Sequence, residues 1–423
     1  SNGHGEDISG ALIGAELAQL GHRVEALPLV GHGRAYERAD LPLLGRTREY
    51  STGGLGYTST MARLKEVVQG QVLYVLQRLA LLLRIAHRYD LVLVVGDVIP
   101  LVAAWLSRRP FATYLVAYSS HYEGRLRLPW PCGWLLRRPR FRAVWSRDQL
   151  TADDLSEQLG RPVRFLGNPF LDPLLEGMPQ AGVPQRAAAA APDHGSAHGS
   201  STPSRPVVAV LPGSRLPEAL GNLSLLLQVL ERLPHTEGAG EPILRAALVG
   251  ALKPAEIAAA SAPLGWRYLE ANGATGTALL LREGRRLELH WNRFANVLAG
   301  SDLVLAMSGT ATEQAVALAR PVVQLAGPGP QFTAGFAEAQ RRLLGPGVCC
   351  AAGPVGATAT LEATAQMLQA MLTKLTDPIA GPAWSQTLEA IAAERLGATG
   401  GSARIAAAIQ TILDSPYRAG QAD

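Results

Sequence analysis

A short apolar run that ends in a polar turn is the first pattern in this sequence that could do chemistry. Residues 207–211 are aliphatic, and Gly213, Ser214 and Arg215 follow after one proline. At the carboxyl end of a parallel strand, backbone N–H groups and a guanidinium can converge on a phosphate, and a helix N-terminus adds its dipole. The pattern therefore indicates an anion site, although an ordinary strand-to-helix turn would look the same.

A second aliphatic run opens into a turn of small residues. The end of this run and the turn comprise Met307, Ser308, Gly309, Thr310 and Ala311. Small residues allow a diphosphate to approach the backbone closely, and Glu313 in the following helix can accept two hydrogen bonds from a ribose diol. The structural alternative makes Ser308 or Thr310 an N-cap and Glu313 the far half of a capping box.

The opening residues combine glycines with groups that could bind hydroxyls. They are Asn2, Gly3, His4, Gly5, Glu6 and Asp7, and a helix is expected over 11–20. The opening lacks the G-x-G-x-x-G spacing, and no acidic residue ends a second strand about 20 residues on, so NAD binding is not expected. Because a strand should precede such a turn, we also expect a further N-terminal strand.

Asp97 follows an apolar run and one glycine. In a doubly wound sheet, carboxylates at strand ends project into the crevice where ligands bind. The alternative interpretation is that Asp97 caps the helix that follows.

Short apolar runs that alternate with helical patterns must position these groups. The expected strands cover 24–30, 91–95, 113–118, 143–145 and 163–166 in the first half, and 207–211, 244–249, 303–307 and 322–325 in the second. This alternation predicts an α/β fold with parallel, doubly wound sheets. The apolar stretch 67–86 carries Gln and Arg residues, so it predicts an amphipathic helix rather than a membrane span.

Chain length and one tract of low complexity set the domain organisation. A chain of 423 residues exceeds what one hydrophobic core normally supports. Residues 173–206, which include a run rich in Ala, Gly, Ser and Pro, predict a linker between Rossmann-like domains over 1–172 and 207–383. Helical residues 384–423 follow and could pack back on the N-terminal domain.

Composition excludes several classes of function. The net charge is +4 and no nucleic-acid-binding module is present, so nucleic acid is not an expected partner. Three cysteines in no disulfide framework favour a reducing cytoplasm. His194 and His198 lie in the low-complexity tract without Cys partners, so no metal site is expected.

Taken in order, these motifs resemble those of lipid A disaccharide synthases. The opening 3–7 lies where that family has a glycine-rich loop, and 167–172 (G-N-P-F-L-D) resembles its G-H-P-L-x-D segment. Residues 211–215 with Glu218 resemble its L-P-G-S-R-x-x-E motif, and 308–313 its S-G-T-A-x-x-E motif. The sequence departs from the family at the opening, which lacks the G-E-x-S-G-D pattern, and at Asn168.

This resemblance implies a GT-B glycosyltransferase with two Rossmann-like domains facing across a cleft. It further implies a UDP-sugar donor, inversion at the anomeric carbon, and no metal or other cofactor. Lipid-acting glycosyltransferases share a similar glycine-rich loop, so a lipid acceptor is expected. The protein would then be cytoplasmic and peripheral at the inner face of a membrane.

The donor and acceptor would occupy different halves of the chain. Gly213 to Arg215 and Met307 to Glu313 would hold the UDP-sugar, with the uridine near Met307 and the turn 290–292. The acceptor-side loop would comprise Asn2, Gly3 and Gly5. An inverting displacement needs a base on the acceptor side, and the candidates are Asp97, His4 and Asp7, of which we favour Asp97.

Two other functions are also consistent with the sequence. A non-hydrolysing UDP-N-acetylglucosamine 2-epimerase would share the architecture and the nucleotide, although its H-x-E-A-G and D-S-G-G motifs are absent. A non-catalytic UDP-sugar-binding protein is the other rival.

In segment 125–142, arginines are interleaved with Trp130, Trp134 and Phe141, which suits an anionic membrane surface, although a solvated loop is the alternative.

Overall fold

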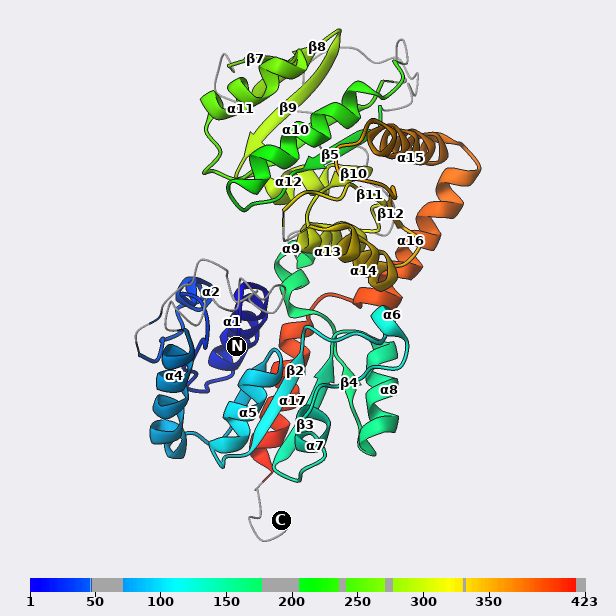
Figure 1. The fold of residues 1–423 in the computed structure, drawn as a ribbon. Coiled ribbons are helices and arrows are strands. Elements are labelled where there is room, and N and C mark those ends of the chain that lie inside the picture. Colours follow the sequence, from blue (N-terminus) through cyan, green and yellow to red (C-terminus); the bar gives the residue numbers. More distant parts are fainter. Residues whose placement is uncertain are drawn as a thin grey trace, which may run out of the picture. The chain divides into compact units, whose positions relative to one another are not determined.

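The computed structural model describes residues 1–45, 47, 71–176, 205–235, 241–270, 277–329 and 332–415. The chain divides into two compact units (Figure 1). Unit 1 comprises Ser1–Pro173 and Leu396–Asp423, and unit 2 comprises Leu174–Arg395. Both units are α/β structures built around a mainly or wholly parallel sheet.

Unit 1 contains a four-stranded parallel sheet in the order β1-β2-β3-β4. Its strands are β1 (Val92–Val95), β2 (Phe111–Leu115), β3 (Phe141–Ser146) and β4 (Arg164–Phe165). Their residues are largely buried, as expected for a parallel sheet with helices on both faces. Four of the five strands predicted in this half are therefore present, with shifts at their ends.

Helices cover both faces of this sheet. They are α1 (His4–Gln19), α2 (Arg34–Arg38), α4 (Gln71–Ile85), α5 (Val98–Leu106), α6 (Ser120–Glu123), α7 (Cys132–Leu135), α8 (Gln149–Leu159) and α17 (Gly401–Asp414). Side chains of α5, α7 and α8 pack with Val94 and Phe111 on one face. Side chains of α1 and α17 pack with Val95 and Tyr114 on the other.

The strand predicted over 24–30 is wrong. This segment forms only an isolated parallel bridge between Ala26 and Leu43. A cavity of about 480 Å³ is lined both by residues of this segment, including Val24 and Leu29, and by β1. The apolar side chains of the segment are buried against neighbouring helices and not within a ladder, which is why the apolar pattern alone misled.

Unit 2 contains an eight-stranded sheet in the order β12-β11-β10-β5-β6-β9-β8-β7. Its strands are β5 (Val207–Leu211), β6 (Ile243–Leu248), β7 (Arg267–Leu269), β8 (Ala278–Arg282), β9 (Arg285–Trp291), β10 (Leu303–Ala306), β11 (Val322–Gln324) and β12 (Val348–Cys350). Only the pairings of β7 with β8 and of β8 with β9 are antiparallel. The four predicted strands are present, while β7, β8, β9 and β12 were not predicted.

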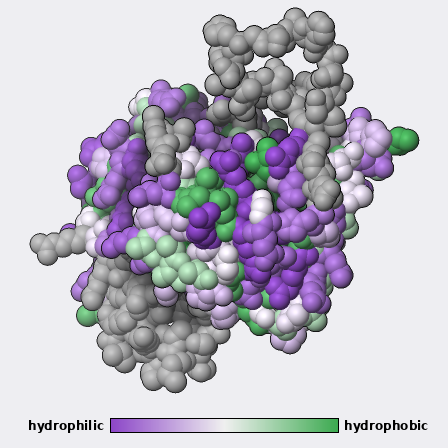
Figure 2. Space-filling model, turned by 90° about the horizontal axis from the view of Figure 1, so that it is seen from above, coloured by the Kyte–Doolittle hydropathy of each residue, from purple (hydrophilic) through white to green (hydrophobic). Residues whose placement is uncertain are grey.

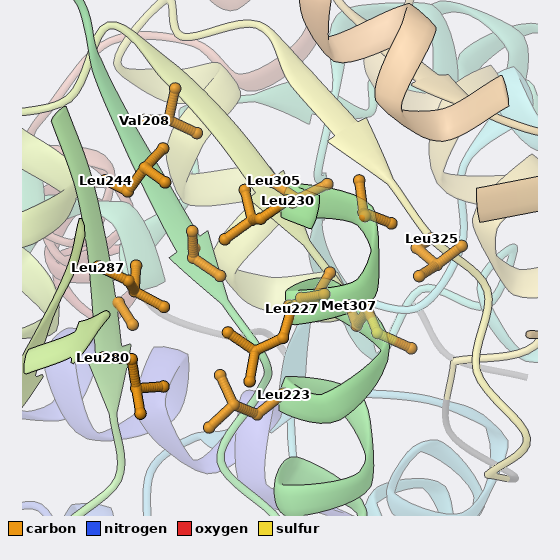
Figure 3. Close-up of a cluster of buried hydrophobic side chains, with 14 of the residues drawn as sticks. Val208, Leu223, Leu227, Leu230, Leu244, Leu280, Leu287, Leu305, Met307 and Leu325 are labelled. Atoms are coloured by element: carbon orange, nitrogen blue, oxygen red, sulfur yellow. The ribbon is translucent and has the colours of Figure 1, made fainter. Parts of the chain in front are cut away.

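The core of unit 2 lies between its sheet and helices that include α10 and α15 (Figure 3). The helices of the unit are α10 (Glu218–Glu231), α11 (Pro254–Ser261), α12 (Phe294–Ala299), α13 (Gly309–Ala317), α14 (Ala334–Leu344), α15 (Thr358–Thr376) and α16 (Ala380–Leu396). In Figure 3, Leu223, Leu227 and Leu230 of α10 face Val208 and Leu305 of the sheet. These buried side chains hold α10 against the sheet.

The chain returns to unit 1 at Leu396, between α16 and α17. Short helix α9 (Asp172–Glu176) begins with Asp172, whose buried carboxylate accepts backbone N–H groups of Gly400, Gly401 and Ser402 at 2.8, 3.1 and 2.8 Å. Asn168 donates to the carbonyl oxygen of Leu396 at 2.8 Å. The motif at 167–172 therefore anchors the returning chain, whereas α16 stays with unit 2.

Most of the expected linker, residues 177–204, lies outside the described residues. Among the residues that the structure describes, no helix combines the length and the apolar character that crossing a membrane requires. The face seen in Figure 2 is mainly hydrophilic, with green hydrophobic patches scattered over it.

Candidate functional site

The two polar turns of unit 2 follow neighbouring strands. Leu211 at the end of β5 pairs with Ala306 at the end of β10. The Met307 N–H donates to the carbonyl oxygen of Leu211 at 2.9 Å. A Cβ added to Gly213, whose φ is +95°, would lie 3.4 Å from the Met307 carbonyl oxygen. The structure thus brings both sequence motifs to one edge of the sheet.

Helix α13 begins without a side-chain cap. Ser308 occupies the N-cap position in an extended conformation, and its side chain makes no capping hydrogen bond. Gly309, Thr310 and Ala311 form the first turn, whose N–H groups have no partner within the helix. Ser308 therefore occupies the expected N-cap position without capping the helix through its side chain. Glu313, at the fifth helical position, is too far along to complete a capping box.

An open helix start of this kind suits an anion. The first-turn amides and the helix dipole both favour negative charge. Ser214 and Arg215, in the neighbouring turn after β5, are exposed. Gly309 is required here because a Cβ at this position would lie 2.7 Å from the ring of Phe336. These groups can hold a phosphate or diphosphate.

Glu313 lies on α13 and is held by a second helix. Its Oε1 accepts a hydrogen bond from Nε2 of Gln340, on α14, at 3.2 Å. Gln340 is buried, whereas Glu313 is half-buried. The carboxylate is therefore fixed in orientation while remaining near the surface, as a group that accepts hydroxyls from a ligand should be.

The side chain of Met307 does not face a ligand. It is 2% exposed and packs in the core beneath α10, where Figure 3 shows it beside Leu227. Only its backbone can serve a nucleoside. The turn after Trp291 lies at the same sheet edge, but β5 and β6 separate β9 from β10. Since strands are about 4.8 Å apart, that turn is roughly 14 Å from the α13 start.

Sequence reasoning missed a loop after β11. Glu218 lies against Gly329, since a Cβ added to Gly329 would be 2.7 Å from Cδ of Glu218. A Cβ on Gly327 would lie 3.1 Å from Oδ1 of Asn222, which donates through Nδ2 to the carbonyl oxygen of Pro212 at 2.9 Å. The G-P-G tripeptide at 327–329 was the signal that could have revealed this close approach.

In unit 1, the carboxylate of Asp97 follows β1 and caps α5. Its Oδ1 accepts the Ile99 N–H at 3.3 Å. Asn2 donates through Nδ2 to both Asp97 oxygens, at 3.3 and 3.4 Å. The expected capping role is present, and the opening loop is brought to Asp97 as well.

Glu6, which the sequence interpretation placed in the opening loop but did not name as a candidate base, lies beside Asp97. Its carboxylate lies on Gly96, where an added Cβ would be 2.3–2.8 Å from the three carboxylate atoms. Oε2 accepts the Asn2 backbone N–H at 2.6 Å. Burial and the nearby charge of Asp97 raise the pKa of Glu6 to about 8, against the opposing effects of the Ser1 amino group and the Asn2 N–H.

The other acceptor-side residues have mixed positions. Asp7 is buried in the first turn of α1, and its Oδ1 accepts from Oγ of Ser1 at 2.5 Å. Gly3 and Gly5 have open space where a Cβ would be added. The side chain of His4 lies outside what the structure describes. Among the described residues, no group of three or more His, Cys, Asp or Glu side chains could hold a metal ion.

No family model matches this sequence. The lipid-A-disaccharide synthase of Alkalilimnicola ehrlichii is 31% identical over 203 residues. This match covers 46% of the present chain and 44% of the relative, so the chain matches less than half the length of this curated protein.

Similar solved structures extend over almost the whole chain. The calicheamicin glycosyltransferase CalG4 has a TM-score of 0.55 at 18% identity, covering 97% of this chain and 95% of that one. MurG of Acinetobacter baumannii has 0.51 at 15%, covering 95% of each chain. A putative UDP-N-acetylglucosamine 2-epimerase of Listeria monocytogenes has 0.52 at 17%, covering 98% and 95%. The two Rossmann-like units thus form a GT-B fold, as the sequence resemblance implied.

Proposed function

We propose that this protein is a glycosyltransferase that transfers a sugar from a UDP-sugar to a lipid acceptor with inversion at the anomeric carbon. The observation that carries the proposal is the uncapped start of α13 beside the Gly213–Arg215 turn, in which Ser214 and Arg215 are exposed. The similarity to a lipid-A-disaccharide synthase supports the same class of reaction and acceptor.

Unit 2 supplies the donor side of the proposed reaction. The diphosphate lies against the amides of Gly309 to Ala311, with Ser214 and Arg215 adding a hydroxyl and a positive charge. Negative charge grows on the diphosphate as the bond from the anomeric carbon to the UDP oxygen breaks. Preorganised N–H groups and a guanidinium stabilise this charge, so the proposed reaction uses no metal ion or other cofactor. Glu313 accepts the ribose hydroxyls.

Unit 1 supplies the acceptor side. Glu6, with its raised pKa of about 8, carries a proton at neutral pH, because burial and then the nearby charge of Asp97 disfavour its ionised form. Asp97 is then the carboxylate that removes the proton from the acceptor hydroxyl. That oxygen attacks the anomeric carbon on the side opposite the leaving UDP, which inverts the configuration. Asn2 orients Asp97, and His4 remains the alternative base.

The acceptor class also fits a surface of unit 1. Trp130 is 89% exposed and Trp134 is 46% exposed. A cavity of about 490 Å³ is lined by Arg125, Arg127 and Arg137, which are close to these two tryptophans in the sequence. Exposed indoles with arginines are typical of the headgroup boundary of an anionic membrane. Contact with such a membrane would place the protein peripherally at its cytoplasmic face.

Vesicle sedimentation tests this surface. The full chain should bind vesicles that contain phosphatidylglycerol more strongly than neutral ones, and salt should weaken the binding. Replacing Arg125, Arg127 and Arg137 by Gln should remove the preference. Binding that is indifferent to anionic lipid and to salt would make the segment a solvated loop.

The central experiment incubates the protein with a panel of UDP-sugars and a membrane lipid extract. We expect UDP release that depends on the lipid, together with a glycosylated lipid in mass spectrometry. Interconversion of UDP-sugars without lipid would instead favour an epimerase, whose fold is equally similar. UDP-sugar binding with neither reaction would identify a non-catalytic binding protein.

A further inference from the structure

Gln340 joins α14 to the start of α13. Its side chain is 2% exposed, and its Nε2 donates to Oε1 of Glu313 at 3.2 Å. Phe336, one turn earlier on the same helix, lies against Gly309, as the close approach of its ring to an added Cβ shows. Helix α14 therefore contacts both the open amide end of α13 and the carboxylate one turn further along.

The oxygen of the Gln340 side-chain amide differs from its nitrogen in its hydrogen bonding. Its Oε1 is buried and has no hydrogen-bond donor among the residues that the structure describes. A buried acceptor without a donor costs stability. Turning the amide over would not help, because its oxygen would then face the carboxylate oxygen of Glu313. The contact with Glu313 therefore determines how this amide is oriented.

We infer that Gln340 is a positioning residue that aims Glu313 at the ribose of the donor nucleotide, so that the site selects ribonucleotides over 2′-deoxyribonucleotides. This inference rests on the proposed function insofar as UDP is the ligand. Gln340 donates to one oxygen of the Glu313 carboxylate. A carboxylate offers about four acceptor positions on its two oxygens, so it can accept a hydrogen bond from an amide and two from a diol together. A freely rotating carboxylate would lose orientational entropy on binding and would discriminate less.

A purely structural role for Gln340 makes the opposite prediction for stability. If its amide only fills the core, Gln340→Met should lower the unfolding temperature, because a favourable hydrogen bond is lost. If the amide is kept for Glu313 while its own oxygen lacks a donor, the apolar replacement of similar length should leave the unfolding temperature unchanged or raise it. Stability and nucleotide selectivity then move independently.

The experiment measures calorimetric affinities for UDP and 2′-deoxy-UDP in the full chain, together with thermal unfolding. The variants are Gln340→Met, Glu313→Ala and their combination, with exposed Gln366→Met on α15 as the matched control. We expect the parent to prefer UDP by about tenfold or more, and Gln340→Met to reduce that preference to about threefold or less. Adding Gln340→Met to Glu313→Ala should change neither affinity further.

Two results would overturn the inference, and they differ from each other. If the parent prefers UDP and Gln340→Met keeps that preference while its unfolding temperature falls, Gln340 is a packing residue and the proposed function stands. If the parent binds no UDP, the proposed function fails and the ribose role fails with it. A lost preference at undiminished stability, with Gln366→Met like the parent, supports it.

Discussion

Two helices of this molecule begin directly after a strand, but they differ in whether a side chain caps their first backbone N–H groups. Helix α5 of unit 1 and α13 of unit 2 each follow a buried parallel strand. Asp97 places its own carboxylate on the start of α5, whereas Ser308 leaves the start of α13 uncapped. The first amide end is already satisfied by an anion of the protein, and the second is free to take one from a ligand.

The contrast extends to the surrounding charges. Glu6 lies close to both Asp97 and Asp7, so carboxyl groups gather at the strand end in unit 1, and in their ionised form they repel a phosphate. The start of α13 consists of small residues, and Arg215 lies in the turn after the neighbouring strand β5. The two strand ends thus differ in whether the N-cap side chain binds the first amides of the following helix, and the proposed roles of base and anion site follow this difference.

The largest effect should come from removing the charge that caps α5. Asp97→Asn keeps a capping oxygen but is a poor base, so we expect turnover to fall about 100-fold or more while UDP-sugar affinity stays within twofold. Steady-state kinetics and calorimetry measure the two quantities. Near-normal turnover would leave Asp97 as a cap alone, and a loss in His4→Ala would then assign the base to His4.

Giving α13 the cap of α5 tests the other half of the contrast. In Ser308→Asp the new carboxylate would occupy the open amides and repel the diphosphate, so we expect UDP affinity to fall about 30-fold. The unfolding temperature should rise slightly. Ala357→Asp is a matched control, because Ala357 is the uncapped N-cap of α15. A Ser308→Asp protein that binds UDP normally would remove the anion site from α13.

Truncating the ribose acceptor should have a smaller effect. Glu313→Ala removes charge-assisted hydrogen bonds worth about 1.5 to 3 kcal/mol, so UDP should bind roughly tenfold to 100-fold more weakly. The fold should survive, because Glu313 is only half-buried. Unchanged affinity by calorimetry would exclude the ribose role.

The smallest effect concerns the pH dependence of unit 1. The pKa of Glu6 is raised from 4.5 to about 8, so between these values the folded state binds more protons than the unfolded state and stability declines as pH rises. The groups facing it are Asp97, Asp7 and the Ser1 amino group. Glu6→Gln should therefore be more stable than the parent at pH 8.5, with the difference vanishing near pH 4.5.

Unfolding temperatures measured across pH 4.5–9 check this. A gain of 1 kcal/mol corresponds to about 2–4 °C for a unit of this size. Asp90→Asn, which changes a carboxylate outside this cluster, serves as the control. An identical pH profile for Glu6→Gln and the parent would contradict the raised pKa.

The sequence was sufficient where a feature depends on neighbouring residues along the chain. Strands β5 and β10 are short apolar runs bounded by turn residues, and their parallel pairing follows from alternation with helices. A common sheet edge for Gly213 and Ser308 follows from this pattern, because parallel strands end at one edge, but the position of β10 directly beside β5 does not. The run 24–30 has the same composition, yet nothing in it reveals that β1 would not pair with it.

Contacts between distant segments could not be predicted in this way. Asn2 reaches Asp97 across 95 positions, and only the fold shows that Glu6 is enclosed beside it. Gln340 lies 27 positions from Glu313 on another helix. A single sequence contains no record of such pairs, so the pKa of Glu6 and the orientation of Glu313 emerge only from tertiary packing.

The carboxylate of Asp172 has a consequence for how this protein can be divided. It accepts four hydrogen bonds from Gly400, Gly401 and Ser402. These bonds hold the start of α17 to a residue that precedes unit 2 in the chain. Unit 2 is one continuous segment inserted into unit 1, whose own chain is in two pieces. A chain that ended after residue 395 would leave the buried carboxyl group of Asp172 without these partners and would expose the side chains that pack against Ile405 and Ile409.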